Sequence, residues 1–161
     1  MQFKISCLLF ITDNQGRLLM IKRNKTPNQG LWSPPGGKLQ MDLGESPVEC
    51  AKREAKEETG LELADNDLNI FGYVSEKDYE GLGHWLMFLF DCRKPISNLP
   101  KSFDEGSFAF FERSKIESLP IPSSDHDLIW PFYDRRKQGL WGVRAHWENG
   151  VAQFKIEASP V

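Results

Sequence analysis

The sequence has few cysteines and histidines, no long apolar run and no strong excess of either charge. Its three cysteines, Cys7, Cys50 and Cys92, are widely spaced along 161 residues. This spacing gives neither a disulfide framework nor a zinc-binding pattern, so we expect a reducing cytoplasmic environment. The formal net charge of −3 argues against a broad basic surface for nucleic acid or for an anionic membrane.

The sequence also lacks a hydrophobic segment long enough to span a membrane, an internal repeat and a low-complexity linker. The apolar run from Ile5 to Ile11 is too short to cross a bilayer, and no cleavage-site pattern follows it. We interpret this run as a strand. A chain of this length can bury a sizeable core, so we expect a single domain over residues 1–161 with no membrane or nucleic-acid partner.

What the sequence does contain is a glycine-bearing loop joined to a helix, from Gly36 to Leu61. Ser46 suits the N-cap of that helix, Pro47 its first position, and Glu49 completes a capping box. Gly60 suits the left-handed conformation just past a helix end. The spacing therefore predicts a helix from residue 47 to residue 59.

One flank of this helix carries an acidic cluster. At about 100° per residue, Glu54, Glu57 and Glu58 share an arc that the two lysines of the helix do not reach, whereas Arg53 could pair with Glu57 or Glu49. We expect a carboxylate cluster without local neutralisation. Carboxylate oxygens suit Mg²⁺ or Mn²⁺, and Mg²⁺ also binds substrate phosphate oxygens. The cluster indicates metal-assisted attack of water on a phosphoryl group, and the alternative is a solvated acidic surface.

This segment resembles the Nudix box, the motif of the Nudix hydrolase family. It reads Gly37, seven residues, Glu45, seven residues, and then REAKEETGL from Arg53 to Leu61. The first spacing is two residues longer than the family's usual one, and Gln40–Leu43 holds the extra length. We expect a bulge in the loop rather than loss of the site. The resemblance implies an α/β/α sandwich with a mixed central sheet.

The resemblance also implies a function. It predicts a Mg²⁺-dependent hydrolase, with Mn²⁺ as a substitute, that cleaves the diphosphate linkage of a nucleoside diphosphate derivative, a nucleoside triphosphate being favoured. The residues that it assigns are Glu54, Glu57 and Glu58 to catalysis and metal binding, Gly37 and Glu105 to additional metal contacts, and Glu45 paired with Arg53 to structural support. Asp104 is the alternative to Glu105, and the choice of general base among the three helix glutamates stays open.

Two other function classes stay open at this point. One is a non-catalytic, regulatory nucleotide-binding module that retains the box. The other is an isomerase of isoprenoid diphosphates, which needs a protonating cysteine or acid, and Cys50 is a poor donor because its helix position indicates packing. A homodimer is a further possibility.

Outside the box, apolar runs and turn residues predict the remaining elements. The predicted strands, loops and helices are an opening hairpin of Phe3–Thr12 with Arg17–Arg23, strands at Asn69–Ser75 and His84–Cys92 around a mobile loop at Glu76–Gly83, a loop and aromatic strand within Ser102–Glu112, helices at Ser114–Leu119 and Ser123–Lys137, and a C-terminal hairpin at about residues 140–156. Asn149-Gly150 is a strong signal for the turn of that last hairpin. The hairpin could pack on the domain or pair with another chain.

Candidate substrate-binding residues lie near these loops. Trp32 could stack on a base or could be a core aromatic residue, and Tyr79 and His84 lie where a substrate lid is expected. A lone histidine at the start of a strand is more often structural than catalytic. Lys22 and Arg23, at a strand end, could contact phosphate or form a solvated edge.

Overall fold

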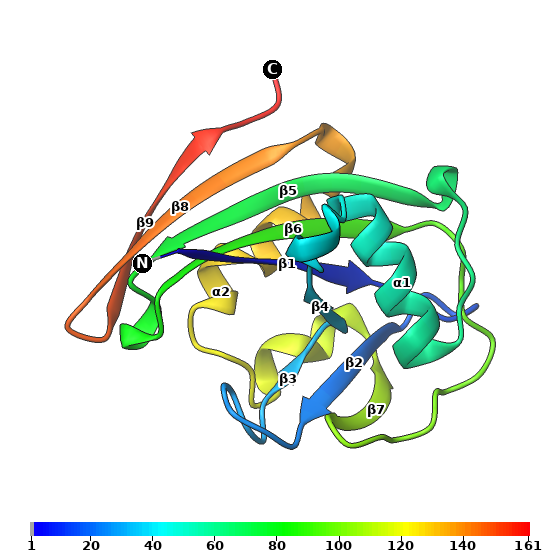
Figure 1. Ribbon diagram of the computed structural model, residues 1–161. Helices are drawn as coiled ribbons and strands as arrows, with labels where there is room; N and C mark the ends of the chain where they lie inside the picture. The colour runs from blue at the N-terminus through cyan, green and yellow to red at the C-terminus, as the bar shows by residue number, and fades with distance from the viewer. Residues whose placement is uncertain (1) are drawn as a thin grey trace.

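The computed structural model describes residues 2–161, and its strands form two sheets (Figure 1). The larger sheet has the order β4-β1-β6-β5-β8-β9, and the smaller has the order β3-β2-β7. The strands are β1 (Phe3–Phe10), β2 (Leu18–Arg23), β3 (Trp32–Ser33), β4 (Gly36–Lys38), β5 (Leu68–Lys77), β6 (His84–Cys92), β7 (Gly106–Phe111), β8 (Trp141–Glu148) and β9 (Val151–Ala158).

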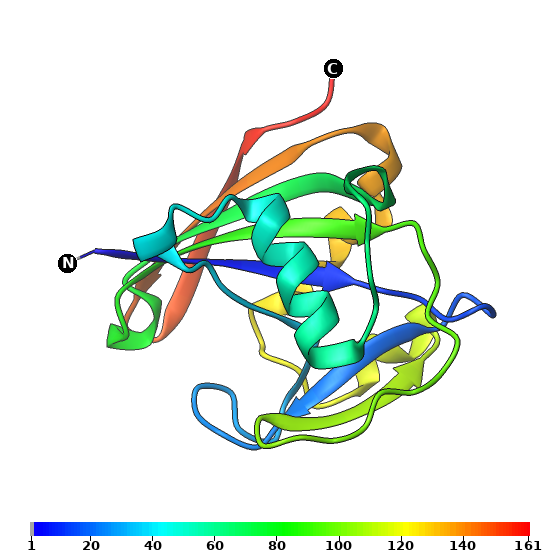
Figure 2. The same ribbon diagram turned by 45° about the vertical axis from the view of Figure 1, so that its right-hand side comes forward.

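Helices cover both faces of the larger sheet. The α-helices are α1 (Pro47–Thr59), α2 (Asp125–Leu128) and α3 (Trp130–Asp134), and short 3₁₀ turns are η1 (Met41–Leu43), η2 (Asp65–Asp67), η3 (Tyr79–Gly81), η4 (Arg113–Ser118) and η5 (Arg136–Gln138). Figure 2 shows α1 in front of β1, with the α2 and α3 segments behind the sheet. The predicted α/β/α arrangement with a mixed sheet is confirmed.

Strand β1 shows why two helical layers are needed. Successive side chains of a strand point to opposite faces. Cys7 and Leu9 are buried in the core that includes Ala51 of α1, while Phe10 belongs to the core beneath α3. The Phe10 ring stacks on Tyr133 with centroids 4.9 Å apart. A strand that is apolar on both faces thus requires other elements packed against each face, here α1 on one and α3 on the other.

The predicted opening hairpin is wrong, because only its turn forms and its two strands do not pair with each other along their lengths. The chain does reverse after β1, and the Leu19 N–H donates to the Ile11 carbonyl at 2.8 Å. The two strands then separate, because β1 pairs in parallel with β6 while β2 pairs antiparallel with β7 in the other sheet. Local sequence specifies a turn between adjacent strands, but their pairing partners come from distant segments.

The later elements follow the prediction with two corrections. The predicted closing helix is divided into α2 and α3 at Ile129, immediately before the segment that contains Pro131. The predicted loop at Glu76–Gly83 begins too early, because β5 continues through Lys77. No helix among residues 2–161 is long and apolar enough to cross a membrane.

The C-terminal hairpin forms as predicted. Asn149 and Gly150 both have positive φ, 52° and 77°, as a tight hairpin turn requires. β8 pairs in parallel with β5, so the hairpin extends the larger sheet and β9 forms its edge. Packing on the domain, one of the two alternatives, is therefore what the structure shows.

Candidate active site

Helix α1 begins and ends at the residues that its sequence predicts. The Glu49 N–H donates to Ser46 Oγ at 3.1 Å, and the Ser46 N–H donates to Glu49 Oε1 at 3.2 Å, which completes the capping box. Gly60 has φ of 76° and its N–H donates to the Lys56 carbonyl. The helix buries Cys50, Ala51 and Ala55, and this orientation leaves its acidic flank facing β4.

The two glycines before the helix belong to a strand, not to a loop. Gly36 and Gly37 form β4, which pairs antiparallel with β1. A Cβ atom on Gly36 would overlap the backbone carbonyl of Cys7, and one on Gly37 would overlap the Glu54 carboxylate. Strand pairing therefore requires glycine at position 36, whereas at position 37 a larger residue would displace the Glu54 carboxylate.

Arg53 connects the loop to the helix. Its Nε and Nη2 atoms donate to the two carboxylate oxygens of Glu45 at 2.7 and 2.9 Å, and Nη2 also donates to the Lys38 carbonyl at 3.0 Å. This bidentate pairing, which the resemblance implied, lowers the pKa of Glu45 to about 2 through the Arg53 hydrogen bonds. The pair holds the end of the long loop against α1.

The same arginine corrects one prediction, because the acidic cluster is partly neutralised. Arg53 Nη1 donates to Glu54 Oε1 at 2.9 Å and to Glu57 Oε2 at 3.1 Å. Geometry on an isolated helix suggested Glu57 as a partner but did not indicate contact with the adjacent Glu54. The arginine reaches both carboxylates because Glu45 and Lys38 already hold its guanidinium over this side of the helix.

The extra loop residues form a compact turn. Met41–Leu43 make the single 3₁₀ turn η1, and Gly44 follows in the left-handed conformation with φ of 65°. The Gln40 N–H donates to Glu45 Oε1 at 3.0 Å. The expected bulge is therefore present, and it leaves the contact between Glu45 and Arg53 intact.

Glu58 lies deeper than its two neighbours in the cluster. Its Oε2 atom is buried and makes no hydrogen bond with the part of the chain that the structure describes. Burial, followed by repulsion from Glu54 and Glu105, raises the pKa of Glu58 to about 8. Burial also raises the pKa of Glu54, although the Arg53 hydrogen bond opposes that shift.

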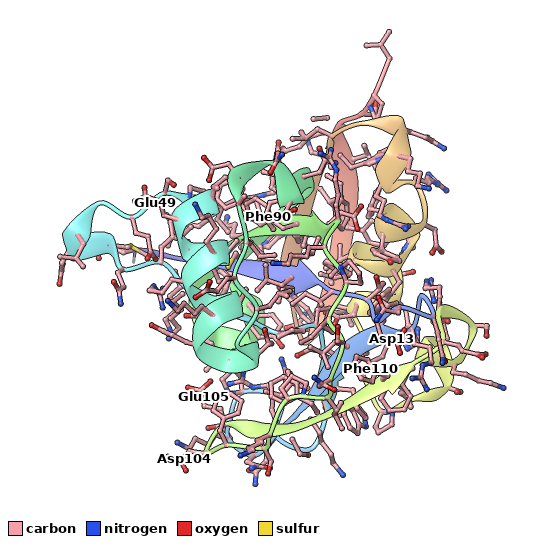
Figure 3. All side chains as sticks on the ribbon, turned by 90° about the vertical axis from the view of Figure 1, so that its right-hand side faces the viewer. Asp13, Glu49, Phe90, Asp104, Glu105 and Phe110 are labelled. Carbon is pink, nitrogen blue, oxygen red and sulfur yellow. The ribbon has the colours of Figure 1, made fainter. Side chains whose placement is uncertain are left out.

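A large cavity lies beside this cluster. Its volume is about 990 Å³, and residues of both sheets, α1 and α2 line it. The predicted site residues on its wall are Gly37, Arg53, Glu54, Glu57, Glu58, Tyr79 and Glu105. Figure 3 shows Glu105 below the C-terminal end of α1, with Asp104 farther from the helix. The structure therefore brings Glu105, and not Asp104, to the cavity beside the α1 cluster.

The donor set suits a hard divalent cation. Among the side chains that the structure describes, no three acidic, histidine or cysteine residues converge as metal ligands, and Arg53 Nη1 donates to Glu54 Oε1. Glu58 nevertheless presents a buried oxygen without a partner, beside the carboxylates of Glu54 and Glu105 that raise its pKa. Mg²⁺ and Mn²⁺ prefer such oxygens, so the chemistry of these residues fits either ion. The carbonyl of Gly37, which was predicted as an additional metal contact, accepts a hydrogen bond from the Cys50 thiol at 3.6 Å.

Comparison with known proteins identifies the family. The family model described as "NUDIX domain" matches residues 2–133. The chain belongs to the NUDIX family. An ADP-ribose pyrophosphatase from Methanocaldococcus jannaschii is 31% identical over 129 residues, which are 80% of this chain and 72% of that protein. The predicted enzyme class, a Nudix pyrophosphohydrolase, is confirmed.

Other relatives agree with this assignment. The human 8-oxo-dGDP phosphatase NUDT18 is 31% identical over 127 residues, but these cover 76% of this chain and only 35% of that protein. A solved structure of a mutator MutT protein from Bacillus halodurans superposes with a TM-score of 0.75, covers 98% of this chain and 99% of its own, and has 23% identity. That likeness shows the Nudix fold.

The three candidate substrate residues are placed differently. Tyr79 lines the cavity, and its hydroxyl donates to Asn28 Oδ1 at 3.2 Å. Trp32 packs against Phe111 with ring centroids 4.9 Å apart and joins the core beneath α3. His84 accepts the Asp78 N–H at Nδ1. The described residues that line the cavity include neither Trp32 nor His84.

Several cavity residues of this Nudix chain carry no signal in the sequence. Arg23, which was considered as a phosphate contact, lines the cavity. The residues that line it without having been predicted are Lys4, Lys38, Glu76, Trp85 and Asp125. They come from five separate elements and match no motif. Alternation along β1 and β5 could have marked the polar residues among apolar neighbours, but not the cavity that they share.

The buried acid predicts how metal-free stability changes with pH. The pKa of Glu58 is raised, so between about 4.5 and 8 the folded state holds a proton that the unfolded state has released. Stability should therefore fall as pH rises through this window. Thermal unfolding in chelator should give a lower Tm at pH 8 than at pH 5, and Glu58→Gln should flatten the slope. Equal slopes in the two proteins would contradict the burial of this carboxyl.

Proposed function

We propose that this Nudix enzyme hydrolyses the diphosphate linkage of a nucleoside diphosphate derivative and depends on Mg²⁺, with Mn²⁺ as a substitute. The observation that carries this proposal is the buried Glu58 oxygen without a partner, placed beside Glu54 on the wall of a large cavity. A buried carboxylate needs a compensating charge or hydrogen bond. A divalent cation supplies the compensating charge, and it attracts a diphosphate to the same place.

The helix glutamates have the central roles in this proposal. Glu54, Glu57 and Glu58 hold the metal, with Glu105 contributing from the loop before β7, and one of the three helix carboxylates accepts a proton from the attacking water. When bound, Mg²⁺ offsets the charge of the phosphate oxygens and acidifies water. Arg53 is a positioning residue that keeps Glu54 and Glu57 on the cavity side.

Cationic side chains on the cavity wall suit the phosphates. Lys4 and Lys38 both line the cavity, and their Nζ atoms lie 5.2 and 5.6 Å from the centroid of the Trp85 ring. Arg23 also lines it and is held by a hydrogen bond from its Nε to the Pro27 carbonyl at 2.8 Å. These charges attract phosphate oxygens that the metal does not contact.

Two substrate classes are supported. A cavity of about 990 Å³ is large enough to enclose most of a nucleotide. A nucleoside triphosphate is the class that we favour, and a relative of 31% identity, an 8-oxo-dGDP phosphatase, supports a nucleotide as the substrate. ADP-ribose is the second candidate, because a relative of 31% identity is an ADP-ribose pyrophosphatase.

A substrate and metal screen tests the proposal. We expect the chelator-treated protein to be inactive and to recover hydrolysis with Mg²⁺ or Mn²⁺. The substrates are the common nucleoside triphosphates, 8-oxo-dGDP, ADP-ribose and an isoprenoid diphosphate. Phosphate, pyrophosphate, nucleoside monophosphate and the isomerised isoprenoid diphosphate are measured as products. Hydrolysis that persists in chelator would contradict the metal role. Inactivity toward all substrates with both metals would favour a regulatory module, and isomerisation of an isoprenoid diphosphate without release of phosphate would favour the isomerase.

A further inference from the structure

The C-terminal hairpin lies beyond the family domain and leaves one strand at the edge of the larger sheet. The match to the family model ends at residue 133, whereas β8 and β9 lie within residues 141–158. β8 pairs with β5, and β9 pairs with β8 and with no other strand of residues 2–161. Figure 1 shows β9 as the outermost strand on that side. Its outer backbone N–H and C=O groups therefore form no ladder within the described chain.

One face of β9 is apolar and exposed. Phe154 and Ile156 are 47% and 46% exposed, and they lie opposite Ala145 and Val143 of β8. Residues opposite one another in an antiparallel pair project from the same face, and Ala145 and Val143 are buried in the core beneath α3. The apolar face of the sheet thus continues onto β9, where it meets solvent. An edge strand with exposed apolar side chains is a template for pairing with another strand.

The other face of β9 carries two opposite charges. Lys155 lies opposite Arg144 of β8, and neither cation forms a salt bridge among the described residues. Like charges directly opposite one another in a sheet are destabilising. Glu157 follows two residues later and has no residue opposite it on β8, because the register shifts there, and its Oε1 accepts the Tyr73 hydroxyl at 3.0 Å. β9 therefore holds a cation without an anionic partner and a carboxylate that is fixed in position.

We propose that β9 pairs antiparallel with β9 of a second copy of this chain, about a two-fold axis at Ile156. In this register Ile156 lies opposite its own copy, and Lys155 lies opposite Glu157 of the partner subunit. The two-fold axis repeats that contact, so each copy supplies one lysine and one glutamate to the other. The two larger sheets join into one continuous sheet.

The charges favour a second copy over an unrelated strand. Lysine on an edge strand ordinarily discourages pairing with another strand. In the two-fold register, each Lys155 receives a carboxylate that Tyr73 already holds in place on the other copy. The same register brings Phe154 and Ile156 of both copies together on the opposite face, so it buries apolar surface that is exposed in the single chain.

The interface is short and lies apart from the cavity. It joins residues 154–158 of each copy, because Pro160 has no N–H with which to continue the ladder. A contact of this size gives reversible association, so dimers should form as the concentration rises. No residue of β9, a strand that the structure describes in full, lines the cavity. The inference is therefore independent of the proposed function and can be tested without substrate.

Charge exchange across the axis tests the inference. Sedimentation of the wild-type chain from about 1 to 200 µM should show the average mass rising from 18.5 kDa towards twice that value. Lys155→Glu and Glu157→Lys each place like charges opposite one another, so each should weaken dimerisation at least about tenfold. The double exchange should restore it. Lys101→Glu, the same charge change on an exposed residue before β7, is the matched control and should dimerise as the wild type does.

Cross-linking locates the axis independently. The three native cysteines are buried, so a short bis-maleimide should link two chains of Ile156→Cys. Val151→Cys, on the same strand, should not be linked, because its two copies would lie about 30 Å apart. Thermal unfolding shows whether each variant remains folded. A wild-type chain that stays monomeric, single exchanges that leave dimerisation unchanged, a double exchange that fails to restore it, or equal linking at both positions would overturn the inference.

Discussion

Replacing both Glu57 and Glu58 with glutamine should lower kcat by about 10³-fold or more while the protein remains folded. Glutamine preserves shape but removes the negative charges that we propose hold the metal, and metal-assisted charge stabilisation contributes several kcal/mol to such reactions, each 1.36 kcal/mol being about tenfold in rate. Glu58 is buried with an oxygen that lacks a partner. Its neutral replacement should therefore not destabilise the metal-free fold. Steady-state kinetics with the best substrate of the screen and thermal unfolding measure the two effects.

A control for general loss of acidic charge is available next to the helix. Glu62→Gln removes an exposed carboxylate that pairs with Lys56 at 3.3 Å and does not line the cavity. Its kcat should match that of the wild-type enzyme. If the double variant turned over substrate at the wild-type rate in Mg²⁺, the assignment of the α1 glutamates to catalysis would be wrong.

Gly36→Ala should destabilise the fold by about 3 kcal/mol or more, since overpacking typically costs 1–3 kcal/mol and here the obstacle is backbone. The new methyl group would overlap the Cys7 carbonyl and approach Leu8 Cα. No side-chain rotation relieves that contact, so β4 must separate from β1. For a chain of this size we expect Tm to fall by roughly 6–12 °C, and calorimetry would show it.

The adjacent Gly37→Ala separates stability from activity. The atoms nearest to its methyl group would be those of the Glu54 carboxylate, which is the far end of a flexible side chain and can move. We expect Tm to stay within about 3 °C of the wild-type value, while displacement of Glu54 from β4 lowers activity at least tenfold. Equal loss of Tm in the two alanine variants would contradict the different roles that the structure gives these glycines.

The acidic arc shows where sequence reasoning about this site was incomplete. Helical periodicity placed Glu54, Glu57 and Glu58 on one flank, and all three line the cavity. The arc was expected to lack a neutralising cation. Arg53 supplies one because Glu45, from the loop, and the Lys38 carbonyl, from β4, orient its guanidinium across the helix. Helical spacing counts neighbours on one helix and does not include partners that other segments bring to it.

The sequence by itself determined helix α1, its caps, the C-terminal turn and the Nudix family. The caps and the turn depend on residues that are neighbours in the sequence, and the family assignment depends on one continuous motif. Tertiary structure alone decided that β1 and β2 enter different sheets, that Trp32 packs away from the cavity, and that Glu76 and Asp125 share one wall. Strand pairing and cavity walls are set by contacts between distant segments. Their energies depend on burial and on charges that become neighbours only when the chain has folded.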